Sequence, residues 1–486
     1  MITKYIKKGL MGLFLVSLCY GCDLTENLTG QPTPDKFFQQ MSDFESFIMG
    51  AYSPITVMYA SDGPYVAHGG AEDIATSVVR WQPLNIGDFN DLGNPDEITL
   101  ELWNPYYSSI SSCNTLLQLI AANTHFSEAE LAPIRGEALF VRAFDYFNLV
   151  RRFGEVPILT EANQTNAVNE PQASVAAIYE QVLKDLQNAE EMLPAKQINA
   201  SRPTAVAAKA LLAKVYLTMA GFPLNESSYY ALARDKALEV INSNQYALED
   251  NFFNLWLYEY RYTNTEYLFA LYGNYEISTG GYLQRAVRPW DGGEEGWGDF
   301  TSDKRFLAMF DPADKRIEGT FYLTMRNGSS WQETSEGQPY LSKYRDGGER
   351  SGGYYGPPTM NNANGFYPMI RYADILLVYA EAANLAEGSP SSKAYWAINE
   401  VRKRAGLKEL SGLSPLEFDK AVLNERNFEL AFECNRWFDL CRRHILKETI
   451  EAFEPEAKID DHNYLLPKPI EQLSIMLGLK QNPGYE

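Results

Sequence analysis

The chain has 486 residues and carries 63 acidic against 42 basic side chains, which gives a formal net charge of −21. This charge argues against nucleic acid or an anionic lipid surface as a partner, because both require basic patches. The length would allow two or three domains of about 150 residues each. The sequence has no low-complexity linker after Pro34, so we expect a single body over residues 37–486.

The N-terminus has the pattern of a signal peptide. Three lysines precede an apolar run over residues 10–18, which is too short for a bilayer core, since that takes about 20 residues. Gly21-Cys22 then matches the junction cleaved by a lipoprotein signal peptidase, although Cys19 stands where an aliphatic residue is usual. Cleavage before Cys19 is the alternative, but Leu18 is a poor substitute for the small residue required there.

Lipidation of Cys22 would hold the mature chain at a membrane. Each buried acyl CH₂ contributes ~0.8 kcal/mol, and more than one acyl chain makes such an anchor stable. We therefore predict a signal peptide over residues 1–21 and a lipidated tether over residues 22–36, a polar stretch without periodicity. The sequence contains no further segment long and apolar enough to span a bilayer.

Helical patterning begins near Phe37 and runs to about Tyr52. Three later segments share a helix-pair design, with predicted helices over residues 137–150 and 175–193, 205–220 and 229–241, and 370–386 and 393–404. In the first two segments a small residue precedes an aromatic by three positions, Ala143 before Tyr146 and Ala213 before Tyr216. Such spacing is typical of tetratricopeptide repeats. An ordinary bundle that uses alanine for close contacts is the alternative.

Two stretches interrupt this pattern. Residues 53–96 hold many Gly, Pro, Asp and Asn residues, and residues 273–360 are richer still in Gly and aromatics, with strand-like pieces at 320–324 and 340–344. Loops of this length are uncommon in a compact body unless they have a function. We expect the helices to be scaffold and the two insertions to form the working surface.

Six sequence blocks follow one another in an order typical of a known family. They cover residues 32–38, 137–157, 370–382, 397–407, charged and aromatic positions within 425–440, and 481–485. Together they resemble the SusD/RagB family of outer-membrane lipoproteins, and the resemblance runs from Cys22 to Tyr485. Each block alone would be weak evidence, but their number and order are specific.

The resemblance implies a mostly α-helical, tetratricopeptide-like scaffold with loop-rich insertions that carry a few short strands. It divides the body into a helical part over about 37–245, a loop-rich ligand region over about 273–360 and a helical part over about 366–486. It also implies an outer-membrane, lipid-anchored protein exposed at the cell surface. Such a protein captures a nutrient, usually a glycan, and delivers it to a SusC-like TonB-dependent transporter.

The charged motif within residues 425–440 is predicted to be structural. Glu425, Glu429 and Glu433 are spaced four apart with Arg436 three beyond, and such spacings place opposite charges side by side on a helix. A catalytic carboxylate cluster is the alternative. Cys434 and Cys441, seven apart on one predicted helix, would lie ~10 Å apart and cannot form a disulfide. We expect buried free thiols.

The insertions carry the candidate ligand-binding residues. Neutral sugars present apolar C–H faces that suit aromatic rings, with polar groups at the rim to fix orientation. The candidates are Trp81, Tyr282, Arg288, Trp290, Trp297 and Trp331. Packing in the core is the alternative for each ring, most of all for Trp297, which precedes a glycine. Trp103 and Trp256 lie in helical context and are predicted to belong to the core.

Metal and enzyme signals are weak. Residues 88–97 are rich in oxygen ligands that suit calcium but fail the EF-hand pattern, so we predict no cofactor and keep calcium as the alternative. The sequence has no HExxH, GxSxG or P-loop motif. The acidic pairs at 294–295 and 460–461 are the only basis for a glycosidase.

The leading hypothesis is therefore a non-enzymatic glycan-capturing lid. A peptide-capturing lid is the first alternative, compatible with Arg288 and Arg305. A protein-interaction scaffold and a glycosidase are further alternatives.

Overall fold

The computed structural model describes residues 38–61, 63–67, 71–76, 95–294, 296–345 and 364–485. The chain divides into two compact units, residues 1–43 and 44–486, and the second unit contains all of the predicted helix pairs. The predicted lipidation site at Cys22, the tether and Trp81 lie outside the described residues. Among the helices of the described part, we find none that is both long and apolar enough to cross a membrane.

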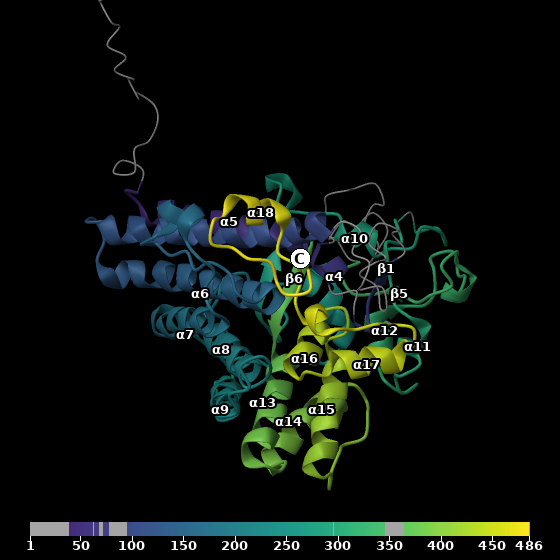
Figure 1. Cartoon of the computed structure of the whole chain (residues 1–486). Coiled ribbons are helices and arrows are strands. Elements are labelled where there is room, and N and C mark those ends of the chain that lie inside the picture. The colour runs from purple at the N-terminus through teal and green to yellow at the C-terminus, as the bar shows by residue number, and fades with distance from the viewer. Residues whose placement is uncertain are drawn as a thin grey trace, which may run out of the picture. The chain divides into compact units, whose positions relative to one another are not determined.

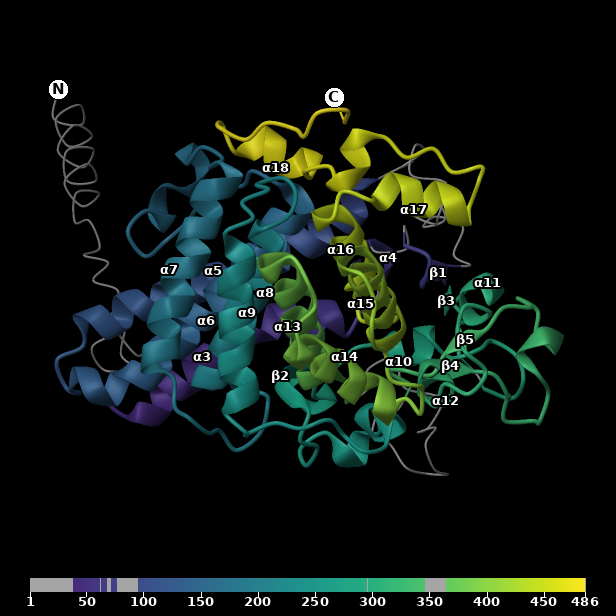
Figure 2. The same cartoon turned by 90° about the horizontal axis from the view of Figure 1, so that it is seen from below.

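The second unit is built from helices that pack in succession (Figures 1 and 2). Each of the long helices contacts the next one along the chain from α5 to α9, and α13 then packs on α9, α14 and α15. The helices are α3 (Met41–Tyr59), α5 (Pro95–Ala122), α6 (Glu128–Phe153), α7 (Val175–Met192), α8 (Ala205–Met219), α9 (Tyr229–Asn242), α13 (Tyr372–Glu387), α14 (Ser392–Arg404) and α15 (Pro415–Glu429). The mostly α, tetratricopeptide-like fold predicted from the sequence is confirmed.

Local sequence explains where these helices begin. Ser127 caps α6 in a capping box, in which its side chain accepts from the backbone N–H of Glu130 and the Glu130 carboxylate accepts from the N–H of Ser127. Ser414 caps α15 in the same way, and Pro415 occupies the first helical position, where a missing N–H costs nothing. Because α8 is rich in buried alanines, its neighbours can approach closely.

Two small sheets complete the unit. Strand β2 (Tyr267–Tyr272) pairs antiparallel with β6 (Phe366–Arg371), which leads directly into α13. The second sheet has the order β1 (Ala75–Thr76), β3 (Phe300–Thr301), β5 (Tyr340–Leu341) and β4 (Phe321–Tyr322). The strand-like pieces predicted at 320–324 and 340–344 are confirmed as the shorter strands β4 and β5, which pair with each other. Figures 1 and 2 both place this sheet on the side of the unit away from α7.

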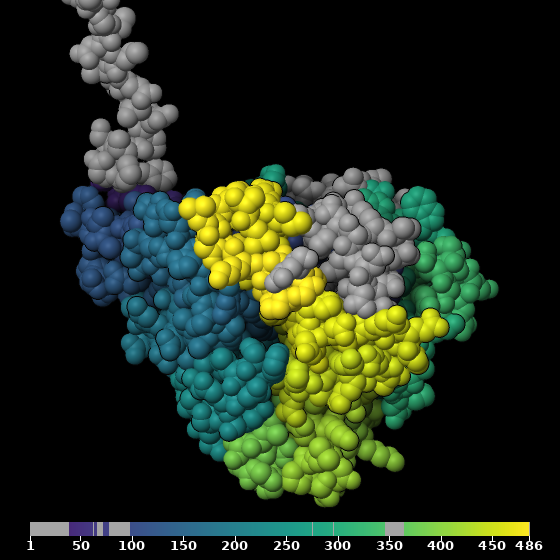
Figure 3. All heavy atoms as spheres, in the orientation of Figure 1, coloured from purple at the N-terminus to yellow at the C-terminus, as the bar shows by residue number. Residues whose placement is uncertain are grey.

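Short helices connect these parts. The α-helical ones are α4 (Gly63–Ala67), α10 (Leu283–Ala286), α11 (Lys304–Leu307), α12 (Arg316–Thr320), α16 (Arg436–Arg442), α17 (Leu446–Phe453) and α18 (Ile470–Ile475). The 3₁₀ helices are η2 (Gln164–Asn169), η3 (Phe252–Trp256), η4 (Tyr258–Tyr260), η5 (Tyr275–Ile277), η6 (Trp331–Glu333) and η7 (Asp461–Tyr464). Figure 3 shows the C-terminal residues, in yellow, spread over one face against the helices of the first half of the chain.

The charged motif is a buried ion-pair network, as predicted, but its partners come from distant elements. Helix α15 ends at Glu429, so Glu433 and Arg436 do not share a helix with it. Glu429 pairs with Arg371 and Arg404, and Arg436 pairs with Glu72 instead of Glu433. The prediction of neighbouring charges along one helix was therefore wrong here, because the chain turns between residues 430 and 435.

The prediction that two cysteines share one helix is wrong for the same reason. Cys434 precedes α16 in a left-handed conformation (φ 56°), so it does not share a helix with Cys441. Both are nevertheless buried free thiols, as is Cys113. The prediction of buried free cysteines is confirmed, but the prediction that Cys434 and Cys441 lie on one helix is not.

Candidate functional site

The loop-rich insertion is fastened to the helical part through α10. The backbone N–H of Leu283 donates to the carbonyl of Ala60 at 3.0 Å, at the end of α3. Gly281 lies so close to Ala60 that a Cβ at this position would overlap the Ala60 carbonyl. The sequence therefore needs glycine here. The close approach also fixes the position of the next residue, Tyr282, which is the first of the predicted site residues that the structure describes.

Tyr282 and Trp297 form an aromatic pair beside α10. Their ring centroids lie 5.3 Å apart at an interplanar angle of 48°, and the guanidinium carbon of Arg285 lies 5.1 Å from the Trp297 ring centroid. The backbone N–H of Trp297 donates to the carbonyl of Arg285 at 2.9 Å. Both aromatic residues are half-buried, so part of each remains accessible from solvent.

Trp290 is the most accessible of the described candidate rings, with 70% of its surface exposed. It stands on a closed loop, in which the N–H of Gly296 donates to the carbonyl of Pro289 and the N–H of Gly298 donates to that of Arg288, both at 2.8 Å. The ring is therefore exposed on a backbone that is held in place. Loops carry binding residues disproportionately, so this exposed ring is a candidate binding platform.

Trp331 belongs to the same group of loops as Trp290. Its ring packs against a small cluster formed by Tyr322, Met325 and Tyr340, and it remains half-buried. The Asp291 carboxylate, next to Trp290, accepts from the N–H of Ser335 at 2.7 Å, just beyond η6. The structure thus joins the Trp290 loop to the Trp331 segment.

The Trp290 loop and the segment around Trp331 together form the loop group. Glu294 lies buried at its centre. It accepts hydrogen bonds from the hydroxyl of Tyr322 and from the N–H of Arg326, and it pairs with the guanidinium of Arg345 at 2.9 Å. Arg288, predicted as a ligand contact, is only 4% exposed and donates to the carbonyl of Arg345 at 2.8 Å. Arg288 therefore lies inside the loop group, where it supports the surface without forming part of it.

Two family models match this chain, one on each side of α9 and the turns that follow it. The model described as "Starch-binding associating with outer membrane" matches residues 32–217, and that of the SusD family matches residues 262–485. The chain belongs to the SusD/RagB family. The second match contains the described part of the loop group and the charged motif, and the first contains the helices from α3 to α7 and most of α8.

Individual SusD relatives match over nearly the whole chain. A SusD-like protein P2 of Formosa agariphila is 28% identical, and the match covers 97% of this chain and 98% of that protein. A SusD superfamily structure from Parabacteroides distasonis superposes with a TM-score of 0.79 at 26% identity, covering 91% of this chain and 99% of that one. A structure titled a laminarin-binding SusD-like protein has a TM-score of 0.76 at 23% identity, over 92% and 100% of the two chains.

A polar groove beside Tyr262 is a second candidate site, and the sequence-based prediction did not include it. It has a volume of about 390 Å³ and includes Gln197, Gln245, Arg261 and Tyr262 in its lining. Tyr262 is 49% exposed, and the guanidinium of Arg261 lies over its ring at 4.0 Å. The density of aromatics in residues 258–262, Tyr-Glu-Tyr-Arg-Tyr, was the signal that could have revealed it.

A larger cavity of about 600 Å³ lies elsewhere, and none of the loop candidates lines it. Within the described ranges, no three His, Cys, Asp or Glu side chains come together in a way that could hold a metal ion. The acidic stretch 88–97, considered for calcium, lies outside the residues whose side chains are described.

Proposed function

We propose that this chain is a lipid-anchored, surface-exposed protein that captures a nutrient glycan and delivers it to a SusC-like TonB-dependent transporter. The observation that carries the proposal is Trp290, a largely exposed ring on a loop held by its own backbone hydrogen bonds. Membership of the SusD family and the likeness to a laminarin-binding relative support a glycan as the ligand.

The arginines that made peptide capture plausible are already occupied. Arg288 is buried against the Arg345 carbonyl. Arg305 forms ion pairs with Asp303 at 2.7 Å and with Glu454 at 3.0 Å. Because neither guanidinium is left to receive a peptide carboxylate, the loop surface favours a neutral ligand.

We also infer that the protein binds without turnover. Of the acidic pair at 294–295, Glu294 is buried and committed to Arg345 and Tyr322. A glycosidase needs two carboxylates that face its substrate, and Glu294 has no access to one in this arrangement. This supports capture as the role of the loop group.

Calorimetric titration of the soluble chain, residues 23–486, with laminarin and starch oligosaccharides tests glycan capture. Stacking on one ring contributes on the order of 1 kcal/mol, so Trp290→Ala should weaken binding about fivefold. Trp396→Ala, on the distant helix α14, is the matched control and should leave the affinity unchanged. If Tyr262→Ala weakens binding and Trp290→Ala does not, the polar groove is the site and the loop assignment is wrong.

The anchor has a separate test. Cys22→Ala should move the protein from the membrane fraction to the soluble fraction in cells that lack the transporter, because lipidation is the only membrane attachment that the sequence predicts. Retention of the variant on membranes after high-salt and carbonate washing would contradict lipidation at Cys22. Co-purification of the wild-type chain with the product of an adjacent transporter gene tests the partner.

A further inference from the structure

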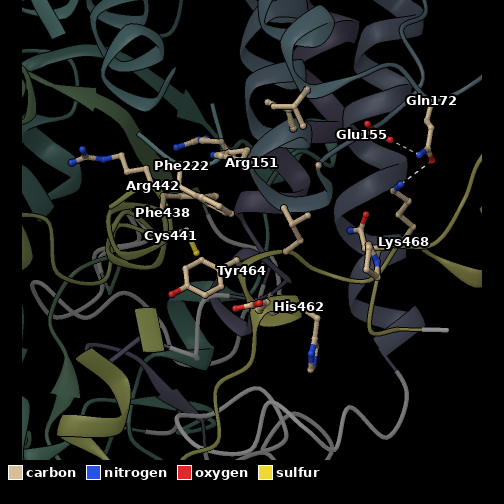
Figure 4. Close-up of a pocket in the computed structure, with 18 of the residues that line it drawn as sticks. Arg151, Glu155, Gln172, Phe222, Phe438, Cys441, Arg442, His462, Tyr464 and Lys468 are labelled. Carbon is tan, nitrogen blue, oxygen red and sulfur yellow. Dashed lines mark hydrogen bonds between the residues drawn. The ribbon is translucent and has the colours of Figure 1, made fainter. Parts of the chain in front are cut away.

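The cavity of about 600 Å³ lies between the end of α6, α16 and the C-terminal segment (Figure 4). Its walls are mostly apolar and include Val150, Val175, Phe222, Phe438, Tyr464 and Leu465. A volume of this size and a wall of this kind are typical of a small-ligand site. This cavity is separate from the candidate site on the loops, because none of the loop candidates lines it.

The walls are held by hydrogen bonds that cross between distant segments. The N–H of Leu466 donates to the carbonyl of Arg152 at 2.6 Å. The side-chain amide of Asn482 donates to the carbonyls of Phe153 at 3.1 Å and Leu466 at 2.8 Å. The C-terminal segment is therefore fixed against the end of α6, and the cavity is formed before any ligand arrives.

Two arginines and two lysines line this cavity, together with the carboxylates of Glu155 and Asp461. Arg442 pairs with Glu381, and Lys480 is exposed. The other two, Arg151 and Lys468, form no ion pair with a carboxylate in the described part of the chain.

Arg151 donates to the carbonyl of Phe147 at 3.1 Å and to the side-chain oxygen of Asn148 at 2.9 Å. Its guanidinium lies between the rings of Phe147 and Phe438, at 3.8 Å from each centroid. These contacts use only part of its five N–H groups.

Lys468 is only 1% exposed. Its ammonium donates to the side-chain oxygen of Gln172 at 2.9 Å and to the carbonyl of Lys480 at 2.7 Å, both neutral acceptors. Glu155 reaches it only through the intervening amide of Gln172, as Figure 4 shows. Burial lowers the pKa of Lys468 to about 8, and burial together with the charge of Arg152 lowers that of Arg151 to about 10.

Several other buried cations have a carboxylate partner. Arg142 pairs with Asp185, Arg316 with Asp314, and Arg442 with Glu381, all among buried side chains. The buried lysine Lys343 likewise pairs with Glu433 at 2.7 Å. Because a buried charge without a counter-charge is costly, the contrast indicates that Arg151 and Lys468 are placed to receive an anion from outside the chain.

We propose that this cavity binds a small ligand in which a carboxylate is attached to a ring. The ring would lie against Phe222 and Tyr464, and the carboxylate would accept hydrogen bonds from the remaining N–H groups of Arg151, with Lys468 adding positive charge. Charge-assisted bonds of this kind are the strongest that a guanidinium makes. A sugar acid and an aromatic acid share this chemistry.

Titration of the soluble chain with two pairs of probes tests the proposal. Glucuronate is compared with glucose, and phenylacetate with 2-phenylethanol, by calorimetry or ligand-observed NMR. At least one carboxylate should bind at least tenfold more tightly than its neutral counterpart, and which one does so identifies the source of the ligand. If neither carboxylate is preferred, the proposal is overturned without the use of any variant.

Variants then locate the binding. Arg151→Met keeps the stem between the two rings and should reduce the carboxylate affinity at least tenfold, whereas Arg135→Met, an arginine on the same helix but outside the cavity, should not. Val175→Trp should abolish binding by filling the cavity while leaving both cations in place. Equal loss in the Arg151 and Arg135 variants would overturn the assignment, as would full affinity in the Val175 variant. Trp290→Ala should leave carboxylate binding intact.

Discussion

Arg371 and Glu429 form an ion pair that is closed off from solvent. A guanidinium nitrogen of Arg371 lies 3.0 Å from a carboxylate oxygen of Glu429, and the two side chains are 1% and 0% exposed. Arg371 ends β6, whereas Glu429 ends α15, so the pair joins the strand that enters α13 to the helix that packs on α13. Arg404 and Arg316 contact the same carboxylate.

Glu429→Gln should therefore lower the free energy of unfolding by about 3–5 kcal/mol, since it leaves buried guanidinium charge without its counter-charge. Burial alone would raise the pKa of Glu429, but the charges of Arg404, Arg371 and Arg316 outweigh it and hold that pKa well below its usual value. Denaturant unfolding at pH 7 measures the change. Glu454→Gln, which disturbs the more exposed pair with Arg305, is the control and should cost less than about 1 kcal/mol.

Asp73 should make the stability of the protein fall as the pH rises. The carboxylates that form buried ion pairs should have the opposite effect. Burial raises the pKa of Asp73 from 3.8 to about 6, although the N–H of Phe432 donates to its carboxylate at 2.9 Å. Well below pH 3.8 both folded and unfolded states are protonated at this residue. Between pH 4 and 6 the unfolded state ionises first, so stability is lost as the pH rises, and above pH 6 the loss is constant.

Asp73→Asn isolates this contribution. The stability of the wild type minus that of the variant should fall by about 2 kcal/mol between pH 4 and pH 6.5, which is most of the effect of a shift of about two pKa units. Asp374, Glu381 and Asp439, whose pKa values are lowered, contribute to both proteins and cancel in the difference. A difference that stays flat across this range would show that Asp73 is ionised at its ordinary pKa.

The repeat helices could be predicted because their signals are local. The spacing of Ala143 and Tyr146 and of Ala213 and Tyr216 identified close helix packing, and all four side chains are buried. Helix α5 was predicted only as helical context around Trp103 and without bounds, although Leu102, Tyr106, Ile110 and Cys113 repeat at helical spacing and are buried. Pro105 and the serine-rich stretch that follows it conceal the pattern in the sequence.

The candidate site could be predicted only in outline. Composition correctly placed Trp290, Trp297 and Trp331 in loops and Trp103 and Trp256 in the core. Which loop ring is exposed depends on backbone closure between residues 289 and 298, and periodicity carries no information about that. The cavity beside Arg151 depends on contacts between segments about 330 residues apart, such as Phe153 with Asn482, so no local pattern could reveal it.

Two glycines should respond to alanine in opposite directions. Gly50 lies exposed within α3, and a Cβ there would meet nothing within 4 Å. Gly50→Ala should therefore raise the free energy of unfolding by about 0.5–1 kcal/mol through helix propensity. A Cβ on Gly221 would overlap the Arg442 carbonyl, which also accepts from the N–H of Phe222 at 2.7 Å.

Gly221→Ala should accordingly lower the free energy of unfolding by about 1–3 kcal/mol, the usual cost of overpacking. Thermal and denaturant unfolding of the two variants provide the comparison. If alanine changes the free energy of unfolding in the same direction at both positions, the contacts described at one of them do not determine the effect of the substitution.

Alanine at one core tryptophan and at three loop tryptophans should change stability by different amounts. Trp256→Ala removes a fully buried ring and should lower the free energy of unfolding by about 3–5 kcal/mol. Trp290→Ala, at a position 70% exposed, should change it by no more than about 0.5 kcal/mol. Trp297→Ala and Trp331→Ala should fall between these limits, because each ring is half-buried and packs against neighbouring side chains, Tyr282 for Trp297 and the Tyr340 cluster for Trp331. Denaturant unfolding gives the order, and the same variants titrated with oligosaccharide give the affinities. A Trp290 variant as unstable as the Trp256 variant would place that ring in the core and remove the observation on which glycan capture by the loops rests.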